Sequence, residues 1–209
     1  MRIWHHLYGL VTIAIFALSI SVAPAAAQYG AQTDGEWPTY GGDLGNTKYS
    51  PLDQITKDNF GELEIVWHWQ SADAFLSKTV AGGGELWTSS RFIFDQLNKE
   101  DPNRWRDNEP PYTGRVKATP LMVGGRLYVN MPTSVGAAID ARTGKTIWIY
   151  NPKTYEAGTT TMSARWIQRG VAYWTDGTEE RILWGTSNGY LVAVDAETGN
   201  LVDSQQTAA

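Results

Sequence analysis

The sequence contains no cysteine. This absence excludes disulfide bonds, thiolate metal sites, haem attachment through a C-x-x-C-H motif and a lipid-modified N-terminal cysteine. Histidine is scarce too, because His68 is the only histidine after the first 27 residues. A cluster of histidine metal ligands or a histidine-based catalytic dyad is therefore not available in this sequence.

An excess of basic residues is also missing. The chain has 17 Lys and Arg against 22 Asp and Glu, and its formal net charge is −5. Proteins that bind nucleic acid need a basic face, so this balance argues against such a partner. Aromatic residues, in contrast, are abundant, with ten Trp and ten Tyr. Their number favours a β-rich architecture with repeated aromatic packing.

A long hydrophobic run occurs only at the start of the chain. The weakly basic Arg2 region precedes an apolar run over 7–23, and the small residues Ala25 to Ala27 offer an A-x-A cleavage site. This order predicts a signal peptide over 1–27, so we expect an exported, periplasmic protein that is free or associated with the membrane. A single membrane anchor is the alternative, although the run is short for a membrane span.

The rest of the chain shows short alternating runs separated by Gly, Asn, Asp and Pro, which is typical of antiparallel strands. Residues 70–116 are an exception and predict a long loop insertion. Within it, 91–100 can form a short helix that ends at Asp101-Pro102, and a proline-rich stretch follows. Such an insertion is either functional or a surface decoration.

An internal repeat is the strongest structural signal. Residues 127–146 align without a gap on 182–201, and both copies contain the motif A-x-D-x-x-T-G. Trp148 follows the first motif, whereas Asp203 stands at the equivalent place in the second copy. Small antiparallel sheets of this kind cannot bury both faces alone. The repeat therefore predicts an all-β fold, a partial β-propeller of about three blade equivalents, each a four-stranded sheet.

The motif has a mechanical explanation. Asp140 and Asp195 end a strand, where a carboxylate can accept backbone N–H groups of the following turn. Gly144 and Gly199 supply the positive φ that closes the hairpin. Trp148 is then placed to pack flat against a neighbouring sheet.

Four segments together resemble the pyrroloquinoline quinone (PQQ)-dependent alcohol and glucose dehydrogenases, which are eight-bladed β-propellers with tryptophan-docking repeats. Residues 36–56 are similar to the N-terminal segment of that family, and 62–70 to the strand after it. Residues 117–129 resemble the opening of the first blade, and 168–174, "QRGVAYW", resemble the R-G-x-A-Y-W segment of the family. The resemblance covers nearly all of 28–209, which it identifies as the N-terminal portion of such a propeller.

The resemblance implies a cofactor contact at Arg169. Its guanidinium would face the central channel near the quinone oxygens, where a fixed cation stabilises negative charge as the quinone is reduced. From spacing alone, a structural arginine before a strand is the alternative. Lys117 stands where the family often has Glu or Gln, and it either pairs with a cofactor carboxylate or is simply solvated. Ser163 and Ala164 replace two adjacent cysteines of many alcohol-oxidising members, which leans towards sugar or polyol substrates.

The family chemistry implied by this resemblance is the oxidation of an alcohol or an aldose, glucose included. PQQ receives a hydride, a bound Ca²⁺ polarises the quinone, and a cytochrome or a membrane quinone accepts the electrons. The Ca²⁺ ligands and the catalytic carboxylate of the family come from later blades. We therefore assign no catalytic and no metal residue in this sequence. We expect the segment 28–209 alone to be inactive as an enzyme.

Two rival functions come from other classes. Non-enzymatic propellers, such as outer-membrane assembly scaffolds in the periplasm, share the Asp–Thr–Gly repeat but need no arginine facing the channel. A sugar-binding module that uses the aromatics of 91–112 is the second rival. Neither explains "QRGVAYW" as well as the dehydrogenase resemblance does.

Overall fold

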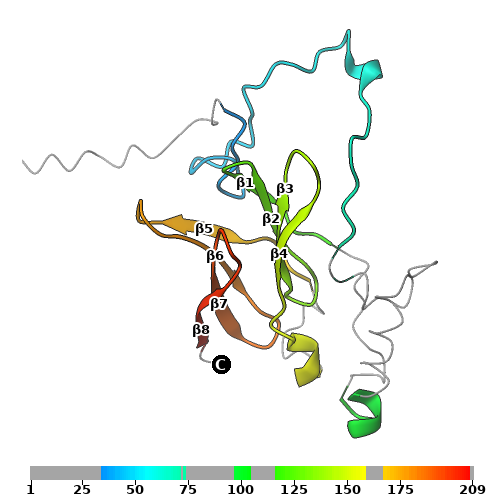
Figure 1. Ribbon diagram of the computed structural model, residues 1–209, viewed down its shortest axis with the longest axis vertical. Coiled ribbons are helices and arrows are strands. Elements are labelled where there is room, and N and C mark those ends of the chain that lie inside the picture. The colour runs from blue at the N-terminus through cyan, green and yellow to red at the C-terminus, as the bar shows by residue number, and fades with distance from the viewer. Residues whose placement is uncertain (1–33, 72, 74–96, 105–115, 159–166, 208–209) are drawn as a thin grey trace, which may run out of the picture.

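The computed structural model describes residues 34–71, 73, 97–104, 116–158 and 167–207. The described residues form two four-stranded antiparallel sheets, which confirms the all-β, partial-propeller expectation (Figure 1). The expected signal peptide and most of the expected insertion lie outside these residues. Within the expected insertion, residues 97–100 are helical and the helix stops before Asp101.

Each sheet follows the order of the chain. The first contains β1 (Leu121–Val123), β2 (Arg126–Asn130), β3 (Gly136–Asp140) and β4 (Thr146–Tyr150). The second contains β5 (Ala172–Thr175), β6 (Glu180–Gly185), β7 (Tyr190–Asp195) and β8 (Leu201–Gln206). Two short 3-10 helices, η1 (Phe60–Glu62) and η4 (Thr154–Ala157), lie outside the sheets.

The two sheets are copies of one unit, as the repeat predicts. Each contains a register shift at the same place, between Ala138 and Ile139 in the first copy and at the equivalent residues of the second. Trp148 pairs with Ala138, and Asp203 occupies the corresponding position. The second copy therefore has a carboxylate where the first has its large aromatic side chain.

The Asp–Thr–Gly turns have the expected geometry. Asp195 accepts hydrogen bonds from the backbone N and the Oγ1 of Thr198, at 2.7 and 2.6 Å. These bonds to the charged form lower the pKa of Asp195, and the same cause acts on Asp140 in the first copy. Gly144 and Gly199 adopt φ values of 68° and 71°, which confirms the left-handed turns.

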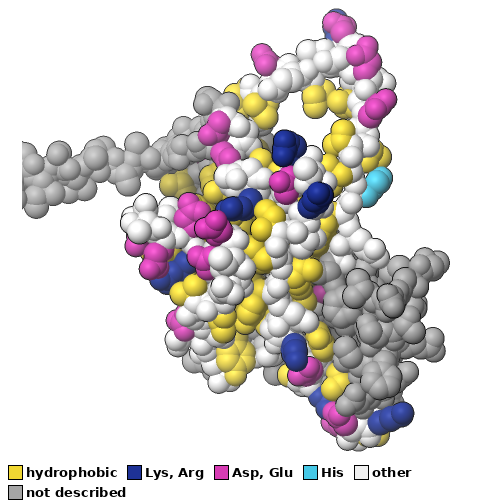
Figure 2. All heavy atoms as spheres, viewed as in Figure 1, with side chains coloured by type: hydrophobic (Ala, Val, Ile, Leu, Met, Phe, Trp, Pro, Cys, Tyr) yellow, Lys and Arg dark blue, Asp and Glu magenta, His cyan; other side chains and the backbone are white. Residues whose placement is uncertain are grey.

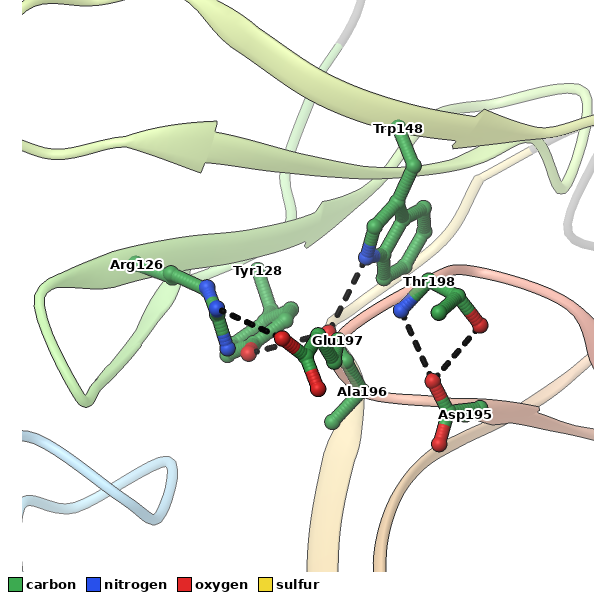
Figure 3. Close-up of polar contacts among 7 residues, drawn as sticks. All are labelled: Arg126, Tyr128, Trp148, Asp195, Ala196, Glu197 and Thr198. Carbon is green, nitrogen blue, oxygen red and sulfur yellow. Dashed lines mark hydrogen bonds and ion pairs between the residues drawn. The ribbon is translucent and has the colours of Figure 1, made fainter.

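Trp148 joins the two sheets. Its Nε1 donates to the carbonyl of Ala196 at 3.0 Å, and Tyr128 donates its hydroxyl to the same carbonyl at 3.2 Å (Figure 3). The indole ring lies over Gly199, where a Cβ would come within 2.6 Å of the ring. Trp148, Tyr128 and Ala196 belong to one buried core cluster that contains side chains of both sheets. The Asp–Thr–Gly turn of the second sheet is thus the docking site for the tryptophan of the first sheet.

The same docking occurs once more, at the first sheet. Trp67 donates its Nε1 to the carbonyl of Ala141 at 3.1 Å, and its ring lies over Gly144 at 2.6 Å from a Cβ position. The strand expected over 62–70 is not formed, because no other described segment pairs with it. Trp67 nevertheless docks as Trp148 does, so this segment stands where the last strand of a preceding blade would lie.

The N-terminal segment attaches to the free edge of β1. Trp37 and Met122 form an antiparallel bridge through hydrogen bonds of 2.8 and 3.0 Å. Behind this bridge, Asp43 accepts hydrogen bonds from the backbone N and the Oγ1 of Thr47 and closes a compact turn. Gly42, at φ 84°, lies against the Trp37 ring, where a Cβ would be 3.0 Å from it. Gly42 therefore allows close packing against the Trp37 ring.

Several apolar side chains of the described residues remain exposed. The long arch that precedes Ser71 (Figure 1) carries a group of them, and hydrophobic side chains are visible along it in Figure 2. All residues of β8 are exposed as well. The exposed set of the arch is Leu44, Tyr49, Leu52, Ile55, Phe60, Leu63, Ile65 and Val66. None of the described helices is both long enough and apolar enough to cross a membrane.

Candidate functional site

The entries to the two sheets lie side by side. Thr119, just before β1, forms a parallel bridge with Gly170, just before β5. The backbone N of Thr119 donates to the carbonyl of Arg169 at 3.2 Å. Gly170 adopts φ 150°, and a Cβ there would lie 3.3 Å from the carbonyl oxygen of Thr119. The glycine of "QRGVAYW" therefore allows the two backbone segments to approach each other. This approach places Arg169 at the junction of the sheets.

Two cationic side chains flank this bridge. Arg169 and Lys117 are both exposed, and neither side chain has a hydrogen-bond or ion-pair partner among the described residues. Arginine offers a planar fork of donors that matches carboxylates and other anionic oxygens, whereas lysine acts as a point charge. The junction can therefore bind a ligand that carries anionic oxygens. The sequence predicted both residues, and the structure brings their backbone segments together.

A buried polar network that sequence reasoning missed holds the residue before Arg169. Gln168 donates its Nε2 to the Oγ of Ser134 at 3.0 Å and accepts at Oε1 from the Nδ2 of Asn130 at 3.2 Å. Ser134 and Asn130 are fully buried at the end of the first sheet. The interactions join residues far apart in the chain, so no local pattern could have revealed them.

Asp73 is a second buried polar residue that the sequence did not single out. It is fully buried and accepts hydrogen bonds from the backbone N of Thr133, at 2.9 Å, and from the Thr133 hydroxyl. The hydroxyl of Thr154 in turn donates to the Thr133 carbonyl at 2.6 Å. Burial disfavours the charged form and raises the pKa of Asp73 to about 6, and the bonds from Thr133 only partly oppose this shift.

The raised pKa of Asp73 predicts a pH dependence of stability. Because the folded-state pKa lies above the unfolded value, the folded state binds the extra proton at low pH, and this stabilisation is lost as the pH rises through about 6. Linkage with these two values gives a loss of about 1 kcal/mol between pH 5 and pH 7. Urea unfolding at both pH values measures it. Asp73→Asn imitates the protonated side chain, so an unchanged pH dependence in that variant would contradict the assignment.

Metal ligands are not gathered in the part of the chain that the structure describes. No group of three or more His, Asp or Glu residues there could hold a metal ion. Ser163 and Ala164, which occupy the place of the family's adjacent cysteines, lie outside the described residues. The described residues therefore offer no cluster of carboxylates as a candidate Ca²⁺ site.

The sequence matches a known protein family. The family model of the PQQ-type glucose/ethanol/alcohol dehydrogenase β-propeller domain matches residues 37–205. The chain is 30% identical to the dehydrogenase subunit of a quinone-linked alcohol dehydrogenase from Gluconobacter oxydans, over 93% of this chain and 21% of that protein. It is 34% identical to a cytochrome c-linked 1-butanol dehydrogenase from Thauera butanivorans, over 83% of this chain and 19% of that protein.

A solved structure shows the same arrangement of strands. The quinohemoprotein alcohol dehydrogenase from Comamonas testosteroni superimposes with a TM-score of 0.56 and 29% identity, over 85% of this chain and 20% of that protein. The chain therefore spans about a fifth of the length of the relatives that it matches.

Proposed function

Because the chain belongs to the family of PQQ-type glucose/ethanol/alcohol dehydrogenase β-propeller domains, we propose that it forms the N-terminal part of a PQQ-dependent dehydrogenase that oxidises an alcohol. The observation that carries this proposal is the family match over both sheets, with the exposed Arg169 at the junction between them. The proposed location is the periplasm, which rests on the signal peptide expected from the sequence.

When bound, PQQ would supply a two-electron acceptor for the hydride of the carbinol carbon, and a base would be needed for the hydroxyl proton. This chain contributes binding and orientation. The Arg169 guanidinium would donate to quinone oxygens and stabilise the negative charge that develops on them. Lys117 would pair with a carboxylate of the cofactor. The described residues contain no cluster of carboxylates that could hold Ca²⁺, so no role towards that ion is assigned to them.

The proposed electron acceptor is a cytochrome or a quinone, because the names of two relatives state these acceptors. An alcohol is the proposed substrate, since each of those relatives is named for one. An aldose such as glucose remains the second candidate, and it rests on Ser163 and Ala164 in place of the adjacent cysteines.

The proposal is tested with the complete protein, in which all propeller blades are present. The apoprotein is mixed with PQQ and Ca²⁺, and dye reduction is measured with ethanol, 1-butanol and glucose. We expect dye reduction that depends on both PQQ and an alcohol. A folded protein that binds no PQQ and oxidises neither the alcohols nor glucose would contradict the proposal and favour the non-enzymatic scaffold.

A further inference from the structure

Ser134 adopts a left-handed backbone conformation at a position where the second copy of the repeat has a glycine. It closes the β2–β3 turn with φ 67°, and its N donates to the Met131 carbonyl at 2.8 Å. Gly189 closes the corresponding β6–β7 turn with φ 86° and the same bond, to the Thr186 carbonyl. Positive φ is strained for residues other than glycine, and such outliers concentrate at functional sites. A serine in the first copy therefore calls for a role of its hydroxyl.

The Ser134 hydroxyl is the centre of a buried network between the sheets. It accepts from the backbone N of Ser187 at 2.9 Å and from the Nε2 of Gln168 at 3.0 Å. Its oxygen also lies 3.3 Å from the Ser187 hydroxyl. Two of these contacts attach the second sheet to the first, and the contact with Gln168 leads directly to the entry of β5.

Gln168 has both ends of its amide engaged. Its Oε1 accepts from Asn130, and its Nε2 donates to Ser134, so the side chain has one orientation. Asn130 is fully buried, and its Oδ1 has no partner within the described segments. Gln168 therefore supplies the only polar contact that those segments offer to the Asn130 side chain.

We propose that Gln168 is a positioning residue for Arg169, held by a clamp that consists of Asn130 and Ser134. The clamp fixes the side chain of Gln168, and the backbone N of Thr119 fixes the carbonyl of Arg169. The backbone is thus held on both sides, while the guanidinium stays exposed and available. Preorganisation of this kind increases affinity because less freedom is lost on binding. The inference rests on the proposed function, in which Arg169 binds PQQ.

The test is a double-mutant cycle in the complete apoprotein, with the PQQ dissociation constant measured by fluorescence titration. Gln168→Leu is made with Arg169 present and again in an Arg169→Ala background. We expect about a tenfold loss of affinity in the first case and no change within a factor of two in the second, since coupled residues are not additive. Equal losses in both backgrounds would show a general structural role and overturn the inference.

A second variant covers the case in which Gln168→Leu fails to fold. Ser134→Gly removes the hydroxyl and suits the positive φ, as Gly189 does in the second copy. It should reproduce the same coupling with Arg169. Ser187→Ala is the matched control, because it removes a neighbouring hydroxyl but leaves the Gln168–Ser134 bond. The affinity of this variant for PQQ should not change. If Arg169→Ala itself leaves PQQ binding unchanged, the proposed function fails; if only the coupling is missing, the clamp fails.

Discussion

Replacement of Gly199 by alanine is expected to lower the free energy of unfolding by about 2–5 kcal/mol. Two causes add. An L-residue at φ 71° costs about 1–2 kcal/mol, and the new Cβ would lie 2.6 Å from Cδ2 of Trp148, so the docked ring has to move. Displacing a well-packed side chain costs about 1–3 kcal/mol more. Urea unfolding of the wild type and the variant measures the sum.

Gly125 provides a matched control for the backbone term. Its φ is 73°, and nothing lies within 4 Å of the position of its Cβ, so Gly125→Ala should show only the strain of about 1–2 kcal/mol. Trp148→Ala removes the ring, at an expected cost of about 3–5 kcal/mol. In that background Gly199→Ala should cost no more than Gly125→Ala. Equal costs of Gly199→Ala with and without Trp148 would show that the ring does not dock on this glycine.

Replacement of Arg169 by alanine is expected to weaken PQQ binding to the complete apoprotein by about 10- to 100-fold. Hydrogen bonds to a charged group contribute about 1.5–3 kcal/mol, which corresponds to this range of dissociation constants. Arg169→Lys keeps the charge but loses the planar fork, so it should recover only part of the affinity. Thermal unfolding of the apoprotein should hardly change, because Arg169 is exposed and its backbone bond to Thr119 remains.

Arg142→Ala is the control for a general effect of charge. Arg142 is an exposed arginine in the Asp–Thr–Gly turn of the first sheet, and only its backbone N donates to Asp140 there. Its removal should leave PQQ affinity unchanged. If the two alanine variants weaken binding equally, Arg169 acts only through long-range charge and not as a cofactor contact.

The features that could be predicted from the sequence are those with a local cause. The Asp195 carboxylate and the positive φ of Gly199 both belong to one short turn, so the motif alone specifies the hairpin. A gapless repeat then places Trp148 beside the turn of the next sheet, because both copies fold alike. Lys117 and Arg169 were predicted through a resemblance of short segments, and the backbone contact of Arg169 with Thr119 could not be specified.

The features that escaped prediction depend on contacts between distant residues. Trp67 docks on a carbonyl 74 residues away, whereas Trp148 docks on one only 48 residues away, because the insertion lies between Trp67 and its turn. The equivalence of Trp67 to Trp148 therefore cannot be recognised in the sequence. Asp73 and Gln168 have no motif around them, and only the fold brings them to Thr133 and Ser134.

A crystal structure of the complete protein with bound PQQ would show whether Arg169 faces the cofactor. We expect PQQ to lie beside the junction of β1 and β5, with a guanidinium nitrogen of Arg169 about 3 Å from a quinone oxygen. The Gln168 side chain should retain its bonds to Asn130 and Ser134. PQQ bound elsewhere, or an Arg169 guanidinium that turns away to pair with a carboxylate of the protein, would show that Arg169 is not a cofactor contact.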